Sequence, residues 1–179
     1  MMYSQEAEAY AKHRHLKNAA AELGISFQTL YSRLRKAGVS VTGDKARYGS
    51  TQDKVAVIGE EKFTALVPHA VDQNKHVFQP KVDFVVGDSS VDVKTARPME
   101  SRGAERWAFC LKKQMKTADY FVCFGLDEDD DTECLLLIPR EMLRPTLQTL
   151  SVPRSKNSKW CDFEVTVGEL QRFFSEEPV

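Results

Sequence analysis

Two short stretches of alternating apolar and polar residues constrain the fold of this chain more than any other feature of its sequence. Residues 82–86 carry apolar side chains at every second position, and residues 91–94 do the same. Between them lies Gly-Asp-Ser-Ser at 87–90, a run of residues that favours turns. A period of two is the signature of a half-buried β-strand. The segment is therefore predicted to fold as a β-hairpin with one apolar face.

The length of the turn decides which residues of the two strands face each other. A four-residue loop at 87–90, or a tighter turn at 88–89, pairs Val86 with Val91. Both loops leave the apolar residues of the two strands on one face of the hairpin, against the core, and the charged residues on the other face.

The polar face of the predicted hairpin gathers three charged side chains. Asp83 lies directly across from Lys94, and Asp92 is diagonal to Asp83 on the same face. Two carboxylates within roughly 5–8 Å of each other repel unless a cation lies between them. A bound divalent metal would remove this conflict. The alternative is a solvent-facing hairpin with ordinary ion pairs, because the acid-x-Lys triplet is common and the chain has a second one at 60–62.

A helix is predicted upstream of the hairpin. In residues 54–66 the apolar side chains recur at helical spacing. This spacing places Glu60 or Glu61 on a face that borders the sheet. Glu60 is the preferred candidate because it follows Gly59 and leaves Phe63 for the core.

Together these motifs resemble those of the PD-(D/E)XK nucleases. That family carries a glutamate on a helix, a proline followed by an aspartate, and a strand with Asp/Glu-x-Lys. In this chain the pattern is matched by Glu60, by Pro80 with Asp83, and by residues 92–94, although the proline stands three positions before the aspartate. The resemblance covers roughly residues 52–150. It implies an α/β fold with a restriction-endonuclease-like core, in which helices flank a central mixed sheet.

The same resemblance implies a metal-dependent active site. The ligands implied for Mg²⁺, with Mn²⁺ as a substitute, are Glu60, Asp83, Asp92 and the carbonyl oxygen of Val93. The implied catalytic residues are Glu60, Asp83, Asp92 and Lys94. Lys94 would orient or deprotonate the attacking water, or stabilise charge on the phosphate. One such site cuts one strand, so cutting both strands requires a homodimer or two successive nicks.

Residues 15–38 form a second pattern, two short helices joined by a tight turn, which looks like a helix-turn-helix. Gly24 allows the first helix to end in the left-handed conformation, and Ser26 is placed to cap the second helix. The polar residues of the second helix suit the major groove of double-stranded DNA. The predicted DNA-contacting residues are Gln28, Thr29, Ser32, Arg33 and Lys36. The alternative is a helical hairpin that only packs or dimerises.

The distribution of charge agrees with a nucleic-acid partner. The net charge of the chain is -1, yet residues 1–50 carry eight Lys and Arg against four Asp and Glu. Arg97, just after the predicted hairpin, is a further predicted DNA-contacting residue, and Arg102 and Arg106 follow it as residues that could clamp phosphates. The acidic run at 127–131 is predicted to be a solvated loop between two strands.

The remaining periodic segments complete an α/β order. Strands are predicted at residues 75–79, 119–125, 134–138 and 163–167, helices at 140–150 and 169–174, and residues 107–111 fit either a strand or a helix. The predicted domains are a helix-turn-helix module at residues 1–38, a linker at 39–52 and a nuclease domain at 53–179.

The composition is that of a cytoplasmic protein. No apolar run reaches the length of a membrane span, and the N-terminus lacks the apolar region of a signal peptide, so no membrane partner is expected. The four cysteines include no Cys-x-x-Cys pair that could form a zinc site. Cys110, Cys123 and Cys134 are instead predicted to be core thiols, because each lies in an apolar, strand-like context.

The family resemblance and the helix-turn-helix together indicate a Mg²⁺-dependent DNA endonuclease. We expect it to be site-selective and of the homing type, associated with a phage or a mobile element. One alternative is a helix-turn-helix DNA-binding regulator whose nuclease-like core is catalytically inactive. Another is a restriction enzyme or a junction resolvase, since both use related cores.

Overall fold

A computed structural model describes residues 4–13, 15–39, 41, 49–75, 81–111 and 117–175. Pro80 and most of the predicted linker lie outside these described residues. The chain divides into two compact units, Met1–Lys54 with Asn74–Pro80 and Val55–Gln73 with Lys81–Val179. No helix among the described residues is long and apolar enough to cross a membrane.

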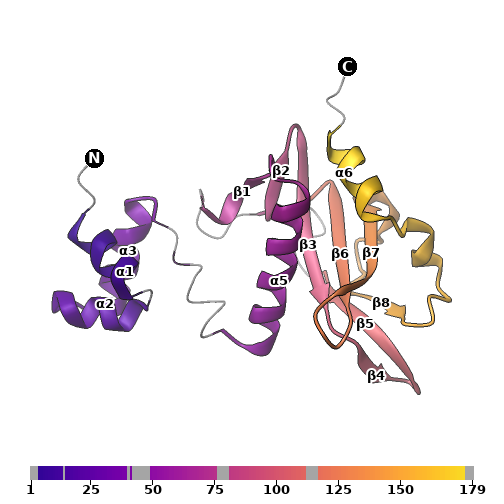
Figure 1. Cartoon of the computed structure of the whole chain (residues 1–179), viewed down its shortest axis with the longest axis horizontal. Coiled ribbons are helices and arrows are strands. Elements are labelled where there is room, and N and C mark those ends of the chain that lie inside the picture. The colour runs from indigo at the N-terminus through magenta and orange to yellow at the C-terminus, as the bar shows by residue number, and fades with distance from the viewer. Residues whose placement is uncertain are drawn as a thin grey trace. The chain divides into compact units, whose positions relative to one another are not determined.

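Among its described residues, the first unit contains three short helices, α1 (Gln5–His13), α2 (Leu16–Leu23) and α3 (Phe27–Lys36) (Figure 1). Helices α2 and α3 confirm the two helices predicted within residues 15–38. Gly24 has a φ of 67°, the left-handed conformation that glycine adopts without steric cost, and it ends α2. The Ser26 Oγ accepts a hydrogen bond from the backbone N–H of Thr29 at 3.1 Å and so caps α3.

Helix α1 is an element that the sequence patterns did not predict. It buries Ala7, Ala9 and Tyr10 in one apolar cluster with Ala19, Ala20, Leu30 and Leu34 of the other two helices. At the start of α2, the His15 Nδ1 accepts a hydrogen bond from the backbone N–H of Asn18 at 3.1 Å. This imidazole is therefore used as a helix cap. In the described part of the first unit, these three helices pack around one small core.

The second unit is built on a five-stranded mixed sheet. Its strands are β1 (Val71–Asp72), β2 (Phe84–Val86), β3 (Ser89–Ala96), β6 (Tyr120–Leu126) and β7 (Thr132–Pro139), in the order β1-β2-β3-β6-β7. Neighbouring strands are antiparallel except β3 and β6, which are parallel. The unit thus has the α/β class and the mixed sheet predicted from the sequence.

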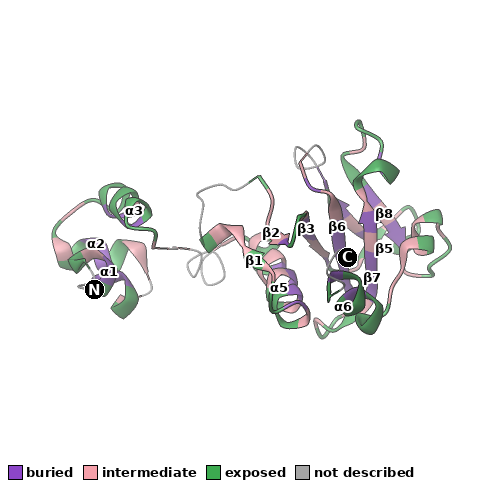
Figure 2. Cartoon of the chain, turned by 90° about the horizontal axis from the view of Figure 1, so that it is seen from above, coloured by how far each residue is buried: buried purple, intermediate pink, exposed green. Residues whose placement is uncertain are grey.

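The two faces of this sheet are covered by different layers. Helices α5 (Thr51–Leu66) and α6 (Val167–Ser175) pack on one face, where Phe63 and Leu170 join a cluster with Val91 and Val93 of β3. A three-stranded sheet of β4 (Met99–Ser101), β5 (Ala104–Cys110) and β8 (Thr149–Pro153) packs on the other face. Figure 2 shows buried residues concentrated on the strands between these layers.

Between the parallel strands β3 and β6, the described part of the chain forms a β-hairpin. The chain leaves β3, forms β4 and β5 in the second sheet, and then returns to β6. Trp107 of β5 packs so closely on Gly125 of β6 that a Cβ at residue 125 would stand 2.8 Å from the indole ring. The Trp107 Nε1–H also donates to the carbonyl of Leu126 at 2.8 Å. Residues 107–111, which fitted either type of element, thus contribute to a strand that holds the two sheets together.

The helix predicted at residues 140–150 is wrong. This segment contains only the short 3-10 helix η3 (Arg140–Met142), and it then continues into β8. Pro145 cannot donate a helical hydrogen bond and disfavours a helical residue before it. The apolar residues Leu150 and Val152 face the core from strand β8, which pairs with β5.

Two predicted strands also need correction. Residues 163–167 form one isolated bridge, Leu136 with Glu164, between the 3-10 helix η4 (Lys159–Phe163) and α6. In the segment 75–79, Lys75 belongs to the 3-10 helix η1 (Gln73–Lys75), and the other residues lie outside the described part of the chain. The edge strand β1 (Val71–Asp72) was not among the predicted strands.

The other predicted elements of the second unit are confirmed with small shifts in their ends. Strands β6 and β7 correspond to residues 119–125 and 134–138, and α6 corresponds to 169–174. Helix α5 begins at Thr51, two residues inside the predicted linker. The Ser50 N–H donates to the Asp53 carboxylate at 3.0 Å, and the Asp53 N–H donates to the Ser50 Oγ at 3.2 Å. This reciprocal capping fixes the start of α5.

The cysteines are all free thiols, as the sequence predicts. Cys123 and Cys134 are buried in the core between the two sheets, whereas Cys110 is exposed. The prediction of a core position is therefore wrong for Cys110. Its neighbours Phe109 and Leu111 fill the core, so the alternation of β5 turns Cys110 outward.

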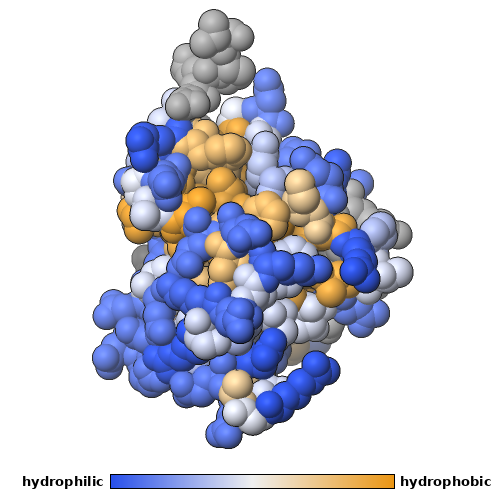
Figure 3. All heavy atoms as spheres, turned by 90° about the vertical axis from the view of Figure 1, so that its right-hand side faces the viewer, coloured by the Kyte–Doolittle hydropathy of each residue, from blue (hydrophilic) through white to orange (hydrophobic). Residues whose placement is uncertain are grey.

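Helix α6 is apolar on more than one side. Leu170 and Phe174 are buried, while Val167 and Phe173 are 45% and 42% exposed. The ring of Phe173 packs edge-on against Tyr120, with centroids 5.0 Å apart. Figure 3 shows apolar residues gathered on this side of the second unit.

The approach of α5 to the sheet is closest at Gly59. A Cβ at this position would stand 1.7 Å from the Thr95 Oγ1 and 3.0 Å from the Thr95 Cβ. An L side chain fits there only if the Thr95 side chain rotates and moves away or if the helix or the strand shifts. Gly59 therefore sets the distance between α5 and β3.

We predict that Gly59→Ala destabilises the second unit by about 1–3 kcal/mol, the cost of forcing an extra methyl group into a packed interior. Urea unfolding followed by tryptophan fluorescence measures this loss of stability, because both tryptophans, Trp107 and Trp160, belong to the second unit. Gly168→Ala in α6 is the matched control, since a Cβ there meets nothing within 4 Å. Equal losses in the two variants would contradict the close approach at Gly59.

Candidate active site

The predicted hairpin is present, but its register differs from the prediction. Val86 pairs with Ser89 and Phe84 pairs with Val91, so the pairing of Val86 with Val91 is wrong by two residues. The turn consists of Gly87 and Asp88 alone. Gly87 has a φ of 58° and Asp88 has no positive φ, the pattern of a type II′ turn with glycine first. An even shift keeps every side chain on its predicted face.

The shift changes which charged residues meet. Asp83, expected opposite Lys94, lies beside Asp92 instead. The backbone N–H of Asp83 donates to the Asp92 Oδ1 at 3.2 Å, and the backbone N–H of Val93 donates to the Asp83 Oδ2 at 2.8 Å. Each carboxylate is thus held by the backbone next to the other one. The two aspartates form an interlocked pair between the loop before β2 and the middle of β3.

Asp92 is the one buried charged residue in the described part of the chain. Its side chain has no exposed surface, and its Oδ2 has no hydrogen-bond partner. The Lys94 Nζ lies 3.9 Å from this oxygen. Burial raises the pKa of Asp92 to about 7, although the charge of Lys94 opposes the shift; the neighbouring Asp83 adds to it. A buried carboxylate oxygen without a hydrogen bond costs free energy unless a ligand or a proton occupies it.

The pair and the lysine fit a divalent cation of the Mg²⁺ type. Mg²⁺ is usually held by one or two carboxylates and completes its shell with water and substrate phosphate oxygens. Asp83 and Asp92 supply two carboxylates side by side, and the unsatisfied Asp92 Oδ2 is a hard oxygen donor. No third carboxylate, histidine or cysteine joins them: among the described residues no group of three or more such side chains could hold a metal ion.

Glu60, the third predicted carboxylate, is on the helix that covers the opposite face of β3. Val91 and Val93 pack with α5, and Thr95 touches Gly59. Because side chains alternate along a strand, Asp92 and Lys94 point to the other face, toward the second sheet. Glu60 is half-buried and Glu61 is exposed. The structure therefore brings Asp83, Asp92 and Lys94 together and leaves both glutamates out of that group.

Asp119 supports the site although the sequence analysis did not single it out. Its carboxylate accepts hydrogen bonds from the backbone N–H and the Oγ of Ser90 at 2.9 and 3.0 Å. These bonds, with that of the backbone N–H first, lower the pKa of Asp119. They join the start of β3 to the start of β6. Ser90, the donor, lies two residues before Asp92. The sequence signal that could have identified Asp119 is its position directly before the apolar run of β6.

The residues predicted to contact DNA on α3 are all exposed, namely Gln28, Thr29, Ser32, Arg33 and Lys36. Two of them already have partners within the unit. The Arg33 Nη1 donates to the Glu6 carboxylate of α1 at 3.0 Å, and the Thr29 Oγ1 lies 2.8 Å from the Ser26 Oγ. Helix α1 thus adds a carboxylate beside the predicted DNA-contacting surface.

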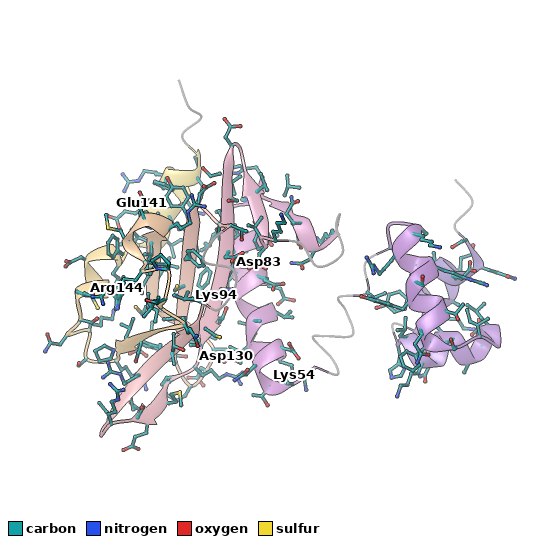
Figure 4. The ribbon with its side chains drawn as sticks, turned by 180° about the vertical axis from the view of Figure 1, so that it is seen from behind. Lys54, Asp83, Lys94, Asp130, Glu141 and Arg144 are labelled. Atoms are coloured by element: carbon teal, nitrogen blue, oxygen red, sulfur yellow. The ribbon has the colours of Figure 1, made fainter. Side chains whose placement is uncertain are left out.

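Arg97, also predicted to contact DNA, is bound to the acidic loop. Its Nε and Nη2 donate to the two carboxylate oxygens of Asp130 at 2.7 and 2.8 Å. Figure 4 places Asp83, Lys94 and Asp130 at successive levels along the strands, so this ion pair lies beyond the carboxylate pair. The loop does connect β6 and β7 as predicted, but its carboxylates are partly paired, since Glu128 also binds Arg154.

In comparisons with protein-family models and with curated proteins, nothing matches this chain. The chemistry of the site therefore carries the functional argument.

We predict that the contribution of Asp92 to the stability of the second unit decreases as the pH rises from about 4 to about 7. Over this range the unfolded chain gives up the Asp92 proton, whose ordinary pKa is 3.8, while the folded protein retains it up to a pKa of about 7. Asp92→Asn has no such proton to lose. Its stability relative to the wild type should therefore increase between pH 5 and pH 8, by on the order of a few kcal/mol.

Urea unfolding followed by tryptophan fluorescence at a series of pH values measures this difference. Taking the difference between variant and wild type removes the contribution of every other titrating group. A constant difference between pH 5 and pH 8 would show that the Asp92 carboxyl titrates normally.

Proposed function

We propose that this protein is a metal-dependent DNA endonuclease with a PD-(D/E)XK-like site and a helix-turn-helix that selects the target. The observation that carries the proposal is the pair of half-buried Asp83 and fully buried Asp92, with the Lys94 Nζ 3.9 Å from the unsatisfied Asp92 Oδ2. A purely structural core has no use for this arrangement, because an unsatisfied buried carboxylate destabilises the fold.

Asp83 and Asp92 are the residues that would hold the metal, together with the carbonyl oxygen of Val93. The chemistry that a bound divalent cation supplies is neutralisation of the phosphate charge and activation of a water molecule. Such a cation would also favour the charged form of Asp92, whose pKa is raised by burial.

The chain's own residues contribute orientation and charge. The backbone N–H groups of Asp83 and Val93 fix the two carboxylates in one relative position. Lys94 is only 12% exposed, so its ammonium group acts in a partly dehydrated environment where its charge has more effect. From the side of β3, it is placed to orient a nucleophile or to stabilise charge on the phosphate.

The first unit supports binding to double-stranded DNA. It has a capped two-helix turn, an exposed polar face on α3, and cations at Arg33, Arg35 and Lys36 near the end of that helix. Tethering such a unit to a cleavage site raises the local concentration of target DNA. This combination supports site-selective, homing-type cleavage over general nuclease action.

A DNA-binding regulator with an inactive core is the second candidate. It is favoured by one observation, the absence of a third metal-binding side chain near Asp83 and Asp92 among the described residues. In that case the first unit would bind DNA, and the carboxylate pair would be a remnant held neutral by a proton shared within it.

We predict Mg²⁺-dependent nicking or cutting of DNA that EDTA abolishes. Supercoiled plasmid carrying phage or genomic fragments is incubated with the full chain, and the products are separated on agarose. Lys94→Ala and Asp92→Asn should each lower the rate roughly 100-fold or more, as loss of a positioned charge at a reacting phosphate does.

Lys62→Ala is the matched control, because Lys62 ends the other acid-x-Lys triplet of the chain, on α5. It should leave the rate close to that of the wild type. Cleavage that survives Asp92→Asn would remove the carboxylate pair from consideration. Selective binding without any cleavage would favour the regulator.

We also predict that Arg33→Ala weakens discrimination between target and unrelated DNA by about 1–3 kcal/mol. Arg35→Ala on the same helix removes an equal charge and should weaken binding to all sequences alike. Fluorescence anisotropy with labelled duplexes at two salt concentrations separates these effects. If the two variants behave identically, Arg33 does not contact base edges.

A further inference from the structure

A hollow of about 410 Å³ lies on the outer face of the second sheet, away from the carboxylate pair. Its lining includes Ser101, Arg102, Arg106, Ala108, Thr149 and Ser151, with Met99 at the edge. These residues come from β4, β5, β8 and the turn between β4 and β5. A volume of this size is typical of pockets for small ligands.

The register of the three strands explains the hollow. Ala108 of β5 stands opposite Ser151 of β8, and Met99 of β4 stands opposite Arg106. Small side chains therefore form the floor, and the longer side chains stand around it. The alternate residues, Trp107 and Phe109 among them, face the core, so the second sheet presents one apolar face and one polar face.

Arg106 is half-buried in this hollow without a carboxylate partner. Its Nε–H donates to the Ser151 Oγ at 2.8 Å, which fixes the plane of the guanidinium group. Within the described residues no ion pair includes Arg106 or Arg102, whereas Arg97 binds Asp130 and Arg154 binds Glu133. A half-buried cation with unused donors is a favourable partner for an anion.

No carboxylate is among the described residues that line the hollow. The nearest acids on the same hairpin are Glu100 and Glu105, which stand opposite each other at alternate positions and so point to the other side of the sheet. Glu105 is bound by the Arg154 Nη1 at 3.1 Å. Nothing on this face therefore competes with a bound anion for Arg102 and Arg106.

Arg102 has an unusual backbone conformation. It occupies the first of the two positions of the tight turn between β4 and β5, with a φ of 54°, and Gly103 follows with a φ of 76°. Two positive φ values are those of a type I′ turn, which asparagine and glycine favour and arginine does not. A strained residue is often kept because its side chain has a function. At this position the side chain of Arg102 lines the hollow.

We infer that this hollow is a binding site for a phosphate group, carried by a nucleic-acid backbone or by a free nucleotide. The two guanidinium groups supply charge and paired N–H donors that match phosphate oxygens. The hydroxyl groups of Ser101, Thr149 and Ser151 supply further donors of the kind that contacts nucleic-acid phosphates. The inference is independent of the proposed nuclease function, because the site shares no residue with the carboxylate pair.

The test is a titration of sodium phosphate into the ¹⁵N-labelled full chain, followed by amide chemical shifts, with chloride used to hold the ionic strength constant. EDTA in every sample excludes metal binding and cleavage. We expect saturable shifts confined to residues 101–108 and 149–151. Arg106→Gln should weaken the apparent affinity for phosphate about tenfold or more. Arg144→Gln is the matched control, an exposed arginine outside the hollow, and should leave the shifts unchanged.

Two further ligands then distinguish the source of the phosphate. If adenosine monophosphate shifts the same amides with a higher affinity than phosphate does, and an oligonucleotide does not, the ligand is a nucleotide. If a short single-stranded oligonucleotide shifts these amides with a higher affinity than phosphate does, the ligand is a nucleic-acid backbone. Shifts that are absent, that do not saturate, or that are equal in the wild type and Arg106→Gln overturn the site.

Arg102→Asn separates function from stability. Asparagine suits the left-handed turn position, so this variant should raise the urea midpoint of the second unit while it weakens phosphate binding. Unchanged phosphate affinity would remove Arg102 from the site. Because this variant is expected to fold better than the wild type, a loss of binding cannot be assigned to misfolding.

Discussion

Strand β3 is covered on both faces, and the chemistry of the second unit depends on this constraint. Helices α5 and α6 pack on the face of Val91 and Val93, and the three-stranded sheet packs on the face of Asp92. The side chain of Asp92, in the middle of this strand, has no exposed surface. Asp92 must then be compensated by what lies next to it, which is the Asp83 backbone N–H, the Lys94 ammonium group, and a proton or a cation.

The layers on the two faces of β3 also separate the residues that the family resemblance would place in one metal site. Glu60 belongs to a helix on one face, while Asp92 and Lys94 point to the other. The second layer is a β-hairpin and a further strand, and it includes residues 107–110, which the sequence left open as strand or helix. The α/β class and the mixed sheet agree with the prediction, whereas Glu60 lies apart from the carboxylate pair.

The arginines of the second unit fall into two groups with different surroundings. Arg97 and Arg154 are held by the acidic loop and its neighbours, which contribute Asp130, Glu128 and Glu133. Arg102 and Arg106 line a hollow that contains no carboxylate. The negative loop therefore neutralises one set of cations and leaves the other set available to an anion from outside the chain. Net charge alone gives no sign of this division.

Local patterns in the sequence determined the elements whose stabilising contacts are local. The sequence predicted the turn at Gly24, the cap at Ser26 and the alternation of the hairpin from residues 82 to 94. Each of these features depends on neighbours only a few residues away. The prediction that Asp83, Asp92 and Lys94 share one site also followed from alternation, which an even shift in register does not disturb.

Only the tertiary structure decided what depends on distant partners. The segment at residues 140–150 became a 3-10 turn and a strand because β8 completes the second sheet beside β5. The same sheet buries Asp92 and thereby raises its pKa, an effect of desolvation that no local pattern contains. Which face of β3 receives α5, and hence where Glu60 lies, was fixed by the contact of Gly59 with Thr95 across 36 residues of sequence. Burial is a property of the assembled layers, so the sequence could name the charged residues but could not say how each is compensated.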